Sequence, residues 1–241
     1  MAWSLGAVGG LTLARCEALS ALEGIVHAFS TRGTSGPTAA ELLAAAGLGS
    51  HPAVMPRQVH GARVLRLGPA APAAGEEADA IVAHRADRPV GVPIVRTADC
   101  LPILLADSGS AAVATVHAGW RGTAAGVVRK AVDELRRMGI PAERLVAAIG
   151  PGIGPCCYEV GPEVESAAAA ALTGAHPPLA AGRHLDLALA NRLQLREAGV
   201  RDRAIHAAPW CTACRPDLFH SYRRDGPGAG RALACIGWPA P

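Results

Sequence analysis

Short apolar runs separated by turn-forming residues dominate the first half of the chain and constrain its fold most strongly. Glycine, proline or aspartate bounds each run, and runs of this length and composition are typical of β-strands rather than helices. The predicted strands are Ile25 to Ser30, Arg63 to Leu67, Ala78 to Ala83, Val90 to Val95, Leu101 to Ala106 and Ala111 to His117. The first half of the chain is therefore expected to be rich in strands.

The second half mixes helical and strand patterns. Apolar residues repeat at helical spacing from Thr123 to Met138, and Gly139 with Pro141 supplies a stop signal. Two further segments, Glu163 to Leu172 and Asp186 to Ala198, also have a helical pattern. The remaining predicted strands are Leu145 to Ile149, Ala204 to Pro209, Phe219 to Arg223 and Leu233 to Gly237.

This order of elements predicts an α+β fold, because strands and helices do not alternate as strictly as in parallel βαβ folds. The chain has 241 residues, half of them hydrophobic, which is enough for a sizeable core. It shows no internal repeat and no long linker. We therefore expect a single catalytic domain over residues 1–241.

Charge and cysteine usage limit the classes of partner. The formal net charge of +3 is spread along the chain, without the basic block expected of a nucleic-acid groove. No stretch reaches the roughly 18 apolar residues of a membrane span, and the start lacks the features of a signal peptide. Seven cysteines, an odd number, suggest reduced thiols. These features favour a cytoplasmic protein that binds neither nucleic acid nor membrane.

Three turn-like segments each carry one potential soft-metal ligand: His60, Cys100 and His117. Two imidazoles and one thiolate suit zinc, and three protein ligands leave one coordination position open, as in catalytic zinc sites. Copper is the expected substitute, because it binds such ligands more tightly than zinc. The spacing alone is a weak signal, because the three residues are scattered along the chain.

The segments around these residues form a recognisable set. QVHG, TADCLPILLAD, VHAGWRGT, AIGPGIGPCCYEVG and FHSYRRDG occur in that order. Together they resemble the YfiH family, also known as the purine nucleoside phosphorylase or laccase-domain family. The resemblance implies mixed sheets packed face to face with helices outside, in α/β/β/α layers. It also implies a zinc enzyme. We expect a monomer or a homodimer.

The activity implied by this resemblance is phosphorolysis of adenosine, inosine and methylthioadenosine, which releases the base and a pentose 1-phosphate, together with deamination of adenosine. Its partners would be a small nucleoside and phosphate. Gln58, Arg121, Cys156 and Arg223 lie in the matching segments and are expected to bind substrate.

Two of the polar residues in these segments are candidates for catalysis. Arg121 is the leading candidate for binding phosphate, because a guanidinium fork matches phosphate oxygens. Asp99, next to Cys100, is either a general base or a carboxylate that orients a histidine ligand, and the second role is favoured.

Two other motifs suggest further binding sites but lack the required spacing. The glycines from Gly150 to Pro155 do not form G-x-G-x-x-G, so this segment is interpreted as a rigid turn and not as a dinucleotide site. Cys211 and Cys214 form a CxxC that lacks a second close pair, because Cys235 stands alone. We therefore expect one zinc per chain and no second, structural zinc.

Three alternatives remain open. A copper polyphenol oxidase would need paired histidines, and the sequence contains no H-x-H. A cysteine hydrolase, such as an amidase that edits peptidoglycan precursors, would use Cys100 as nucleophile and His117 as base. A zinc-stabilised binding module without activity is the third alternative.

Overall fold

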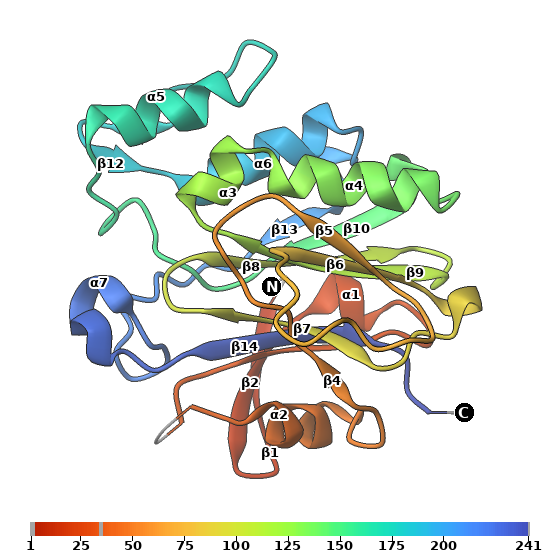
Figure 1. Ribbon diagram of the computed structural model, residues 1–241. Coiled ribbons are helices and arrows are strands. Elements are labelled where there is room, and N and C mark those ends of the chain that lie inside the picture. The colour runs from red at the N-terminus through yellow and green to blue at the C-terminus, as the bar shows by residue number, and fades with distance from the viewer. Residues whose placement is uncertain (1–2, 34–35, 241) are drawn as a thin grey trace.

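The computed structural model describes residues 3–33 and 36–240. Two six-stranded sheets form the centre of the fold (Figure 1). The first sheet has the order β1 (Trp3–Val8), β2 (Leu11–Cys16), β3 (Val26–Ser30), β14 (Ala232–Gly237), β7 (Val92–Thr97), β4 (Ala53–Val54). The second has the order β13 (Ile205–Ala207), β10 (Leu145–Ile149), β8 (Leu101–Asp107), β9 (Ala112–Ala118), β6 (Ala80–His84), β5 (Val64–Leu67).

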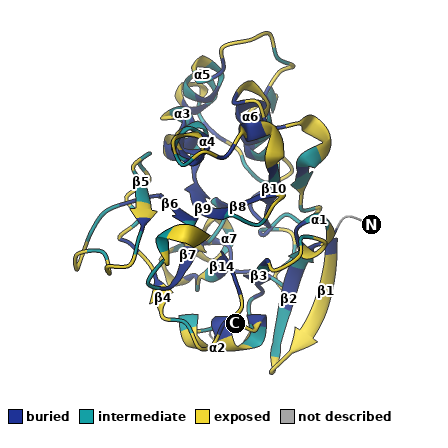
Figure 2. Ribbon diagram, turned by 90° about the vertical axis from the view of Figure 1, so that its right-hand side faces the viewer, coloured by how far each residue is buried: buried dark blue, intermediate teal, exposed yellow. Residues whose placement is uncertain are grey.

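Both sheets mix parallel and antiparallel pairs, and their inner faces form a shared core. Along β8 the side chains alternate between two environments, as the period of a strand requires. Leu104 packs against the first sheet, whereas Ile103 and Leu105 face the helices on the other side. Figure 2 shows the strands between these layers as almost continuously buried, while β1 is exposed at the edge.

Helices cover the outer face of each sheet. The second sheet is covered by α3 (Trp120–Ala124), α4 (Val127–Arg137), α5 (Pro162–Ala170) and α6 (Leu187–Glu197), and the first by α2 (Ala39–Ala46) (Figure 1). Short elements complete the chain: α1 (Glu17–Ser20), β11 (Ala180–Ala181), β12 (His184–Leu185) and α7 (Tyr222–Asp225), with 3-10 turns at Arg85–Asp87, Ala142–Arg144, Asp202–Ala204 and Gly226–Gly228. The predicted α+β class with α/β/β/α layers is confirmed.

The prediction of one continuous helix from Thr123 to Met138 is wrong. The segment instead forms α3 and α4, which are separated at Gly126. Gly126 has φ of 73°, a left-handed conformation that an α-helix excludes. The apolar spacing continues across the break, which is why the pattern suggests one helix.

The predicted strand from Phe219 to Arg223 is also wrong. Ser221 instead accepts a hydrogen bond from the backbone N–H of Arg224, at 3.2 Å, and caps the short helix α7. Several elements are not predicted from the sequence: the β1–β2 hairpin, the short elements α1, β4, β11 and β12, and α2, whose capping box pairs Thr38 with Glu41.

Two connections pass from the first sheet to the second and thereby position the site. The chain leaves β4 in the first sheet and enters β5 in the second, and it does the same between β7 and β8. Among the described residues, no helix has the length and apolar character needed to cross a membrane.

Candidate metal centre and adjoining cavity

His60, Cys100 and His117 converge at the seam between the two sheets. His60 lies on the β4–β5 connection, Cys100 ends the β7–β8 turn, and His117 is the penultimate residue of β9. One ligand atom from each lies within 4.8 Å of the other two, and the imidazole centroids are 4.7 Å apart. This group of donors is compact enough to hold a metal ion.

A buried carboxylate, Asp79, holds two of these ligands in place. Its Oδ1 lies 2.8 Å from Nδ1 of His117 and accepts the backbone N–H of His60 at 2.9 Å. Its Oδ2 accepts the N–H of Gly61 at 2.7 Å and that of Val59 at 3.3 Å. Because Asp79 occupies Nδ1 of His117, Nε2 is the nitrogen that remains for a metal.

The electrostatics of the trio follow from these contacts. Burial disfavours a charge on His117, but the hydrogen bonds to Asp79 and Cys100 prevail and raise its pKa to about 9. The pKa of His60 is lowered, first by burial and then by the neighbouring charge of His117. Below pH 9, a metal would have to displace a proton from His117.

The backbone at the site is locally constrained. His60 and Asp99 have φ of 59° and 81°, in the region that residues with a side chain rarely adopt. A glycine is required at position 119, directly after β9, because the thiol of Cys100 approaches the backbone there. An added Cβ would lie 2.8 Å from Sγ of Cys100. The glycine of the VHAGWRG segment therefore makes room for the thiol.

A cavity of about 760 Å³ opens onto the trio. This volume is within the range of small-molecule sites. Three arginines line it, Arg96, Arg223 and Arg231, and none of them pairs with a carboxylate among the described residues. Tyr158 and Tyr222 supply aromatic surface. The cavity therefore suits a ligand that combines an anionic group with a flat ring.

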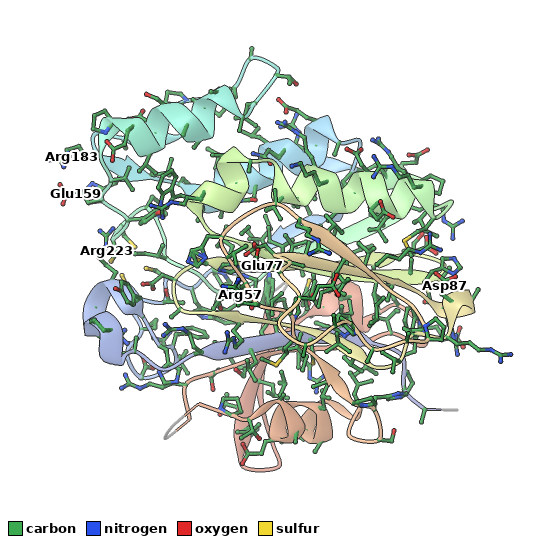
Figure 3. The ribbon with its side chains drawn as sticks, viewed as in Figure 1. Arg57, Glu77, Asp87, Glu159, Arg183 and Arg223 are labelled. Atoms are coloured by element: carbon green, nitrogen blue, oxygen red, sulfur yellow. The ribbon has the colours of Figure 1, made fainter. Side chains whose placement is uncertain are left out.

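Arg223 lies where α7 approaches the loop after β10. Figure 3 shows its side chain between α7 and Glu159. Its guanidinium donates to the carbonyls of Cys157 at 3.2 Å and Glu159 at 2.9 Å, and it lies 5.4 Å from the ring centroid of Tyr158. Burial raises the pKa of Tyr158 to about 12, so this phenol is neutral at physiological pH.

The other residues expected to bind substrate are placed differently. Gln58 lines the cavity, but its amide exchanges two 2.8 Å hydrogen bonds with the backbone of Arg96. Arg121 is exposed and stacks on Trp120, 4.3 Å from its ring centroid, outside the set of lining residues. Cys156 is also outside this set.

Asp99 does not orient a histidine ligand; Asp79 has that position. The carboxylate of Asp99 accepts the hydroxyl of Thr212 and the backbone N–H of Arg223, both at 2.6 Å. The preference for Asp99 as the partner of a histidine is therefore corrected, because its left-handed turn directs it toward Thr212. Asp79 could have been noticed in the sequence as a lone acid within a predicted strand.

A second group of donors corrects the interpretation of the CxxC. Cys211 and Cys214 do have a second close pair, which is Cys156 with Cys157, and the four sulfurs lie within 4.8 Å of one another. Cys235 is buried elsewhere, in the core under α2. The missing pair was the vicinal one, which only the fold brings next to the CxxC.

Comparisons with known proteins agree with this architecture. A family model described as "Multi-copper polyphenol oxidoreductase laccase" matches residues 37–239. A purine nucleoside phosphorylase of Deinococcus radiodurans is 36% identical, over 95% of this chain and 94% of its own length. "Adenosine deaminase RL5", from an unknown prokaryotic organism, is 38% identical over 76% and 74%.

The crystal structure of YlmD from Geobacillus stearothermophilus matches with a TM-score of 0.83 and 30% identity, over 95% of this chain and 96% of that one. This likeness extends over nearly the whole of both chains, and the family model matches most of the sequence. The chain therefore belongs to the laccase-like YfiH family, several of whose members are named purine nucleoside phosphorylases.

Proposed function

We propose that the protein is a zinc-dependent purine nucleoside enzyme. It cleaves adenosine, inosine and methylthioadenosine with phosphate, giving the free base and a pentose 1-phosphate, and it also deaminates adenosine. The observation that carries this proposal is the convergence of His60, Cys100 and His117 beside a cavity lined by guanidiniums. The names of the related phosphorylases and of the related deaminase support it.

The donor set fits zinc. Two imidazole nitrogens and a thiolate are borderline-soft ligands, which magnesium and calcium avoid. The contact between Asp79 and Nδ1 of His117 is the carboxylate–histidine arrangement that usually accompanies a metal ligand. When bound, zinc supplies a Lewis acid beside the cavity.

Different residues of the cavity bind the phosphate and the purine. In this proposal Arg96, Arg223 and Arg231 bind the phosphate, while the rings of Tyr158 and Tyr222 pack against the purine. Asp99 is a positioning residue, since it holds the backbone N–H of Arg223. Arg121, next to the trio, contributes positive charge from outside the cavity.

The two reactions differ in the nucleophile that the cavity must hold. In phosphorolysis a phosphate oxygen forms a bond to the anomeric carbon of the pentose, and the bond from that carbon to the purine nitrogen breaks. In deamination a water oxygen bonds to the purine carbon that bears the amino group, and ammonia leaves. Only the first nucleophile is an anion, so only the first requires the arginines as its binding site.

A second candidate function rests on two residues of the trio, Cys100 and His117, together with Asp79. Cys100, His117 and Asp79 are linked in the order of a thiol–imidazole–carboxylate triad. Such a triad would cleave an amide with Cys100 as the nucleophile. Metal content separates the two candidates, because a thiolate that binds zinc is withdrawn from nucleophilic attack.

A multicopper oxidase is not favoured. In the described part of the chain, the two groups of candidate ligands bring together only two histidines, His60 and His117. The description of the family model names polyphenol oxidation, and that activity is not proposed for this chain.

The test measures adenine and inosine formation from adenosine over a series of phosphate concentrations. We expect Arg96→Ala and Arg223→Ala to lower the phosphorolysis rate roughly 30-fold to 1000-fold, about 2 to 4 kcal/mol of transition-state stabilisation, and to affect deamination less. Arg121→Ala should act in the same direction. Because its guanidinium is outside the cavity, we expect a smaller effect.

Arg137→Ala, exposed on α4, is the matched control and should leave both rates unchanged. Equal losses of both products with an unchanged phosphate dependence would remove these arginines from the phosphate site. If an inactive Cys100→Ser variant holds as much zinc as the wild type, the thiolate of Cys100 is not a ligand. That result would favour the amide-cleaving function.

A further inference from the structure

The fold brings two cysteine pairs that are distant in the sequence to one end of the second sheet. Strands β10 and β13 are parallel neighbours, with Ile149 opposite Ala207, so the loops that follow them leave from the same edge. A backbone bridge between Gly152 and Cys211 keeps these loops together. The first loop carries Cys156 and Cys157, and the second carries Cys211 and Cys214.

The spacing of the four sulfurs fits a single tetrahedral ion. Sγ of Cys214 lies 3.4 Å from Sγ of Cys156 and 3.3 Å from Sγ of Cys157, and all four sulfurs are within 4.8 Å of one another. Four thiolates at about 2.3 Å from zinc stand about 3.8 Å apart. A disulfide would require about 2.05 Å.

The surrounding backbone is suited to thiolates. The N–H of Gly154 donates to Sγ of Cys211 at 3.2 Å. A Cβ at Gly154 would lie 3.2 Å from Cβ of Cys211 and 3.4 Å from Sγ of Cys156, so glycine lets the two loops approach. This close packing explains why position 154, in the segment interpreted as a rigid turn, is a glycine.

Two guanidiniums brace the same loops. Arg224 donates to the carbonyls of Thr212 at 2.9 Å and Ala213 at 3.2 Å, inside the CxxC. Arg223 donates to the carbonyl of Cys157, in the other loop. Arg224 also pairs with Asp225 at 2.7 Å, so the positive charge beside the thiols comes from Arg223.

We propose that Cys156, Cys157, Cys211 and Cys214 bind a second zinc ion, distinct from the ion of the His60–Cys100–His117 trio. Binding converts four thiols into four thiolate ligands and releases four protons, which leaves a complex with two net negative charges beside the guanidinium of Arg223. Since the protein fills all four coordination positions, the site is structural and not catalytic.

The site of Cys156, Cys157, Cys211 and Cys214, here called the zinc clip, would stabilise one wall of the cavity. Thr212, inside the CxxC, donates to Asp99, which in turn holds the N–H of Arg223. Tyr158 directly follows Cys157 and lines the cavity. The clip therefore fixes residues next to the trio without contacting substrate, and it stands independently of the reaction proposed above.

The test combines metal analysis with X-ray absorption at the zinc edge, on protein purified under reducing conditions without chelator. The variant His60→Ala/His117→Ala removes the trio, so any zinc that it retains reports on the clip. We expect about one zinc per chain in this variant, with a shell of four sulfurs at about 2.3 Å. Wild type should hold about one zinc more.

The reciprocal variant, Cys156→Ser/Cys214→Ser, should lose the four-sulfur zinc and keep that of the trio. Cys235→Ala, at a buried cysteine outside both groups, is the matched control and should keep both ions. If the serine variant does not fold, the spectrum of the histidine variant still decides.

Two results would overturn the proposal. One is a histidine variant that contains no zinc and whose four thiols react freely with a thiol reagent. The other is a mass of the metal-free, denatured protein that is lower by two or four hydrogen atoms under reducing conditions, because that would show that these cysteines form one or two disulfides.

Discussion

At the scale of single residues, Asp79 organises the metal centre more than any residue of the recognised segments. One carboxylate binds three successive N–H groups of the His60 loop and Nδ1 of His117. Asp79 is 1% exposed, so water does not compete for these bonds. Two ligands that are distant in the sequence thus depend on the same buried acid.

Asp79→Asn tests this dependence through pH. In metal-free wild type the pKa of His117 is raised to about 9, so the stability that its protonation contributes is present below about pH 6.5 and is lost as the pH rises to about 9. We expect the free energy of unfolding to fall over this range by an amount on the order of 2 to 3 kcal/mol. Asp79→Asn should flatten this slope and weaken zinc binding roughly 10-fold to 100-fold.

Urea unfolding of chelated protein at pH 6, 7.5 and 9 measures the slope. The control is Asp87→Asn, at a half-buried aspartate that pairs with Arg66 and not with a histidine. A wild-type stability that does not change across this range would contradict the assigned pairing.

The residues of the site were predictable to the extent that each carries its own chemistry. Two histidines and a cysteine at turns indicate a metal, and the fold brings them together. Arg96 and Arg231 were not predicted, because the sequence around an arginine in a strand or a loop does not show whether its side chain faces a cavity or solvent. The cysteine quartet was missed for a related reason, since the pairing of β10 with β13 creates it.

At the scale of elements, the break between α3 and α4 shows where local patterns stop being informative. Thr123, near the end of α3, is bound by α6: its hydroxyl accepts a 2.9 Å bond from Asn191 and its carbonyl a 2.8 Å bond from Gln194. Gly126 then redirects the chain, so that α4 packs along β9 and β6. The tertiary contacts of α3 therefore decide where the first helix ends.

Gly126→Ala should destabilise the protein by about 1 to 2 kcal/mol, because alanine is strained at φ of 73°. An added Cβ would meet no atom within 4 Å, so the cost comes from the backbone alone. Gly126→Asn should cost less, since asparagine tolerates the left-handed region. Denaturant midpoints of the three proteins measure this order, and equal costs for alanine and asparagine would point to packing instead.

The strands were easier to predict than the helices and turns. The apolar runs at Leu101 to Ala106 and Ala111 to His117 match β8 and β9 closely, because a buried strand needs only a short apolar segment with turns at its ends. The segment from Phe219 to Arg223 contains two aromatic residues, which favour a strand, but the cap of Ser221 begins the helix α7 there. In this segment a local hydrogen bond prevails over the strand preference of the aromatic side chains.

At the scale of the whole molecule, the metal centre is a junction between the two sheets. His60 and Cys100 lie on the two connections that cross from the first sheet to the second, while His117 belongs to the second sheet itself. A metal bound by all three would therefore tie the crossings to β9. Binding should stabilise the sandwich as a whole and not one loop alone.

Thermal unfolding of the Cys156→Ser/Cys214→Ser variant, which retains only the trio, tests this coupling. At a zinc concentration 100 times the Kd, linkage predicts a gain of about 2.7 kcal/mol, because only the folded chain holds the three ligands together. For a domain of this size, that gain corresponds to a rise in Tm of roughly 5 to 10 °C. The same protein with His117→Ala added should show no rise.

A single cooperative transition that moves to higher temperature with zinc would show that both sheets respond together. A zinc-dependent early transition, with the main one unchanged, would mean that the metal stabilises only the loops around it. That result would contradict the coupling, since the crossings at His60 and Cys100 would then order independently of the shared core.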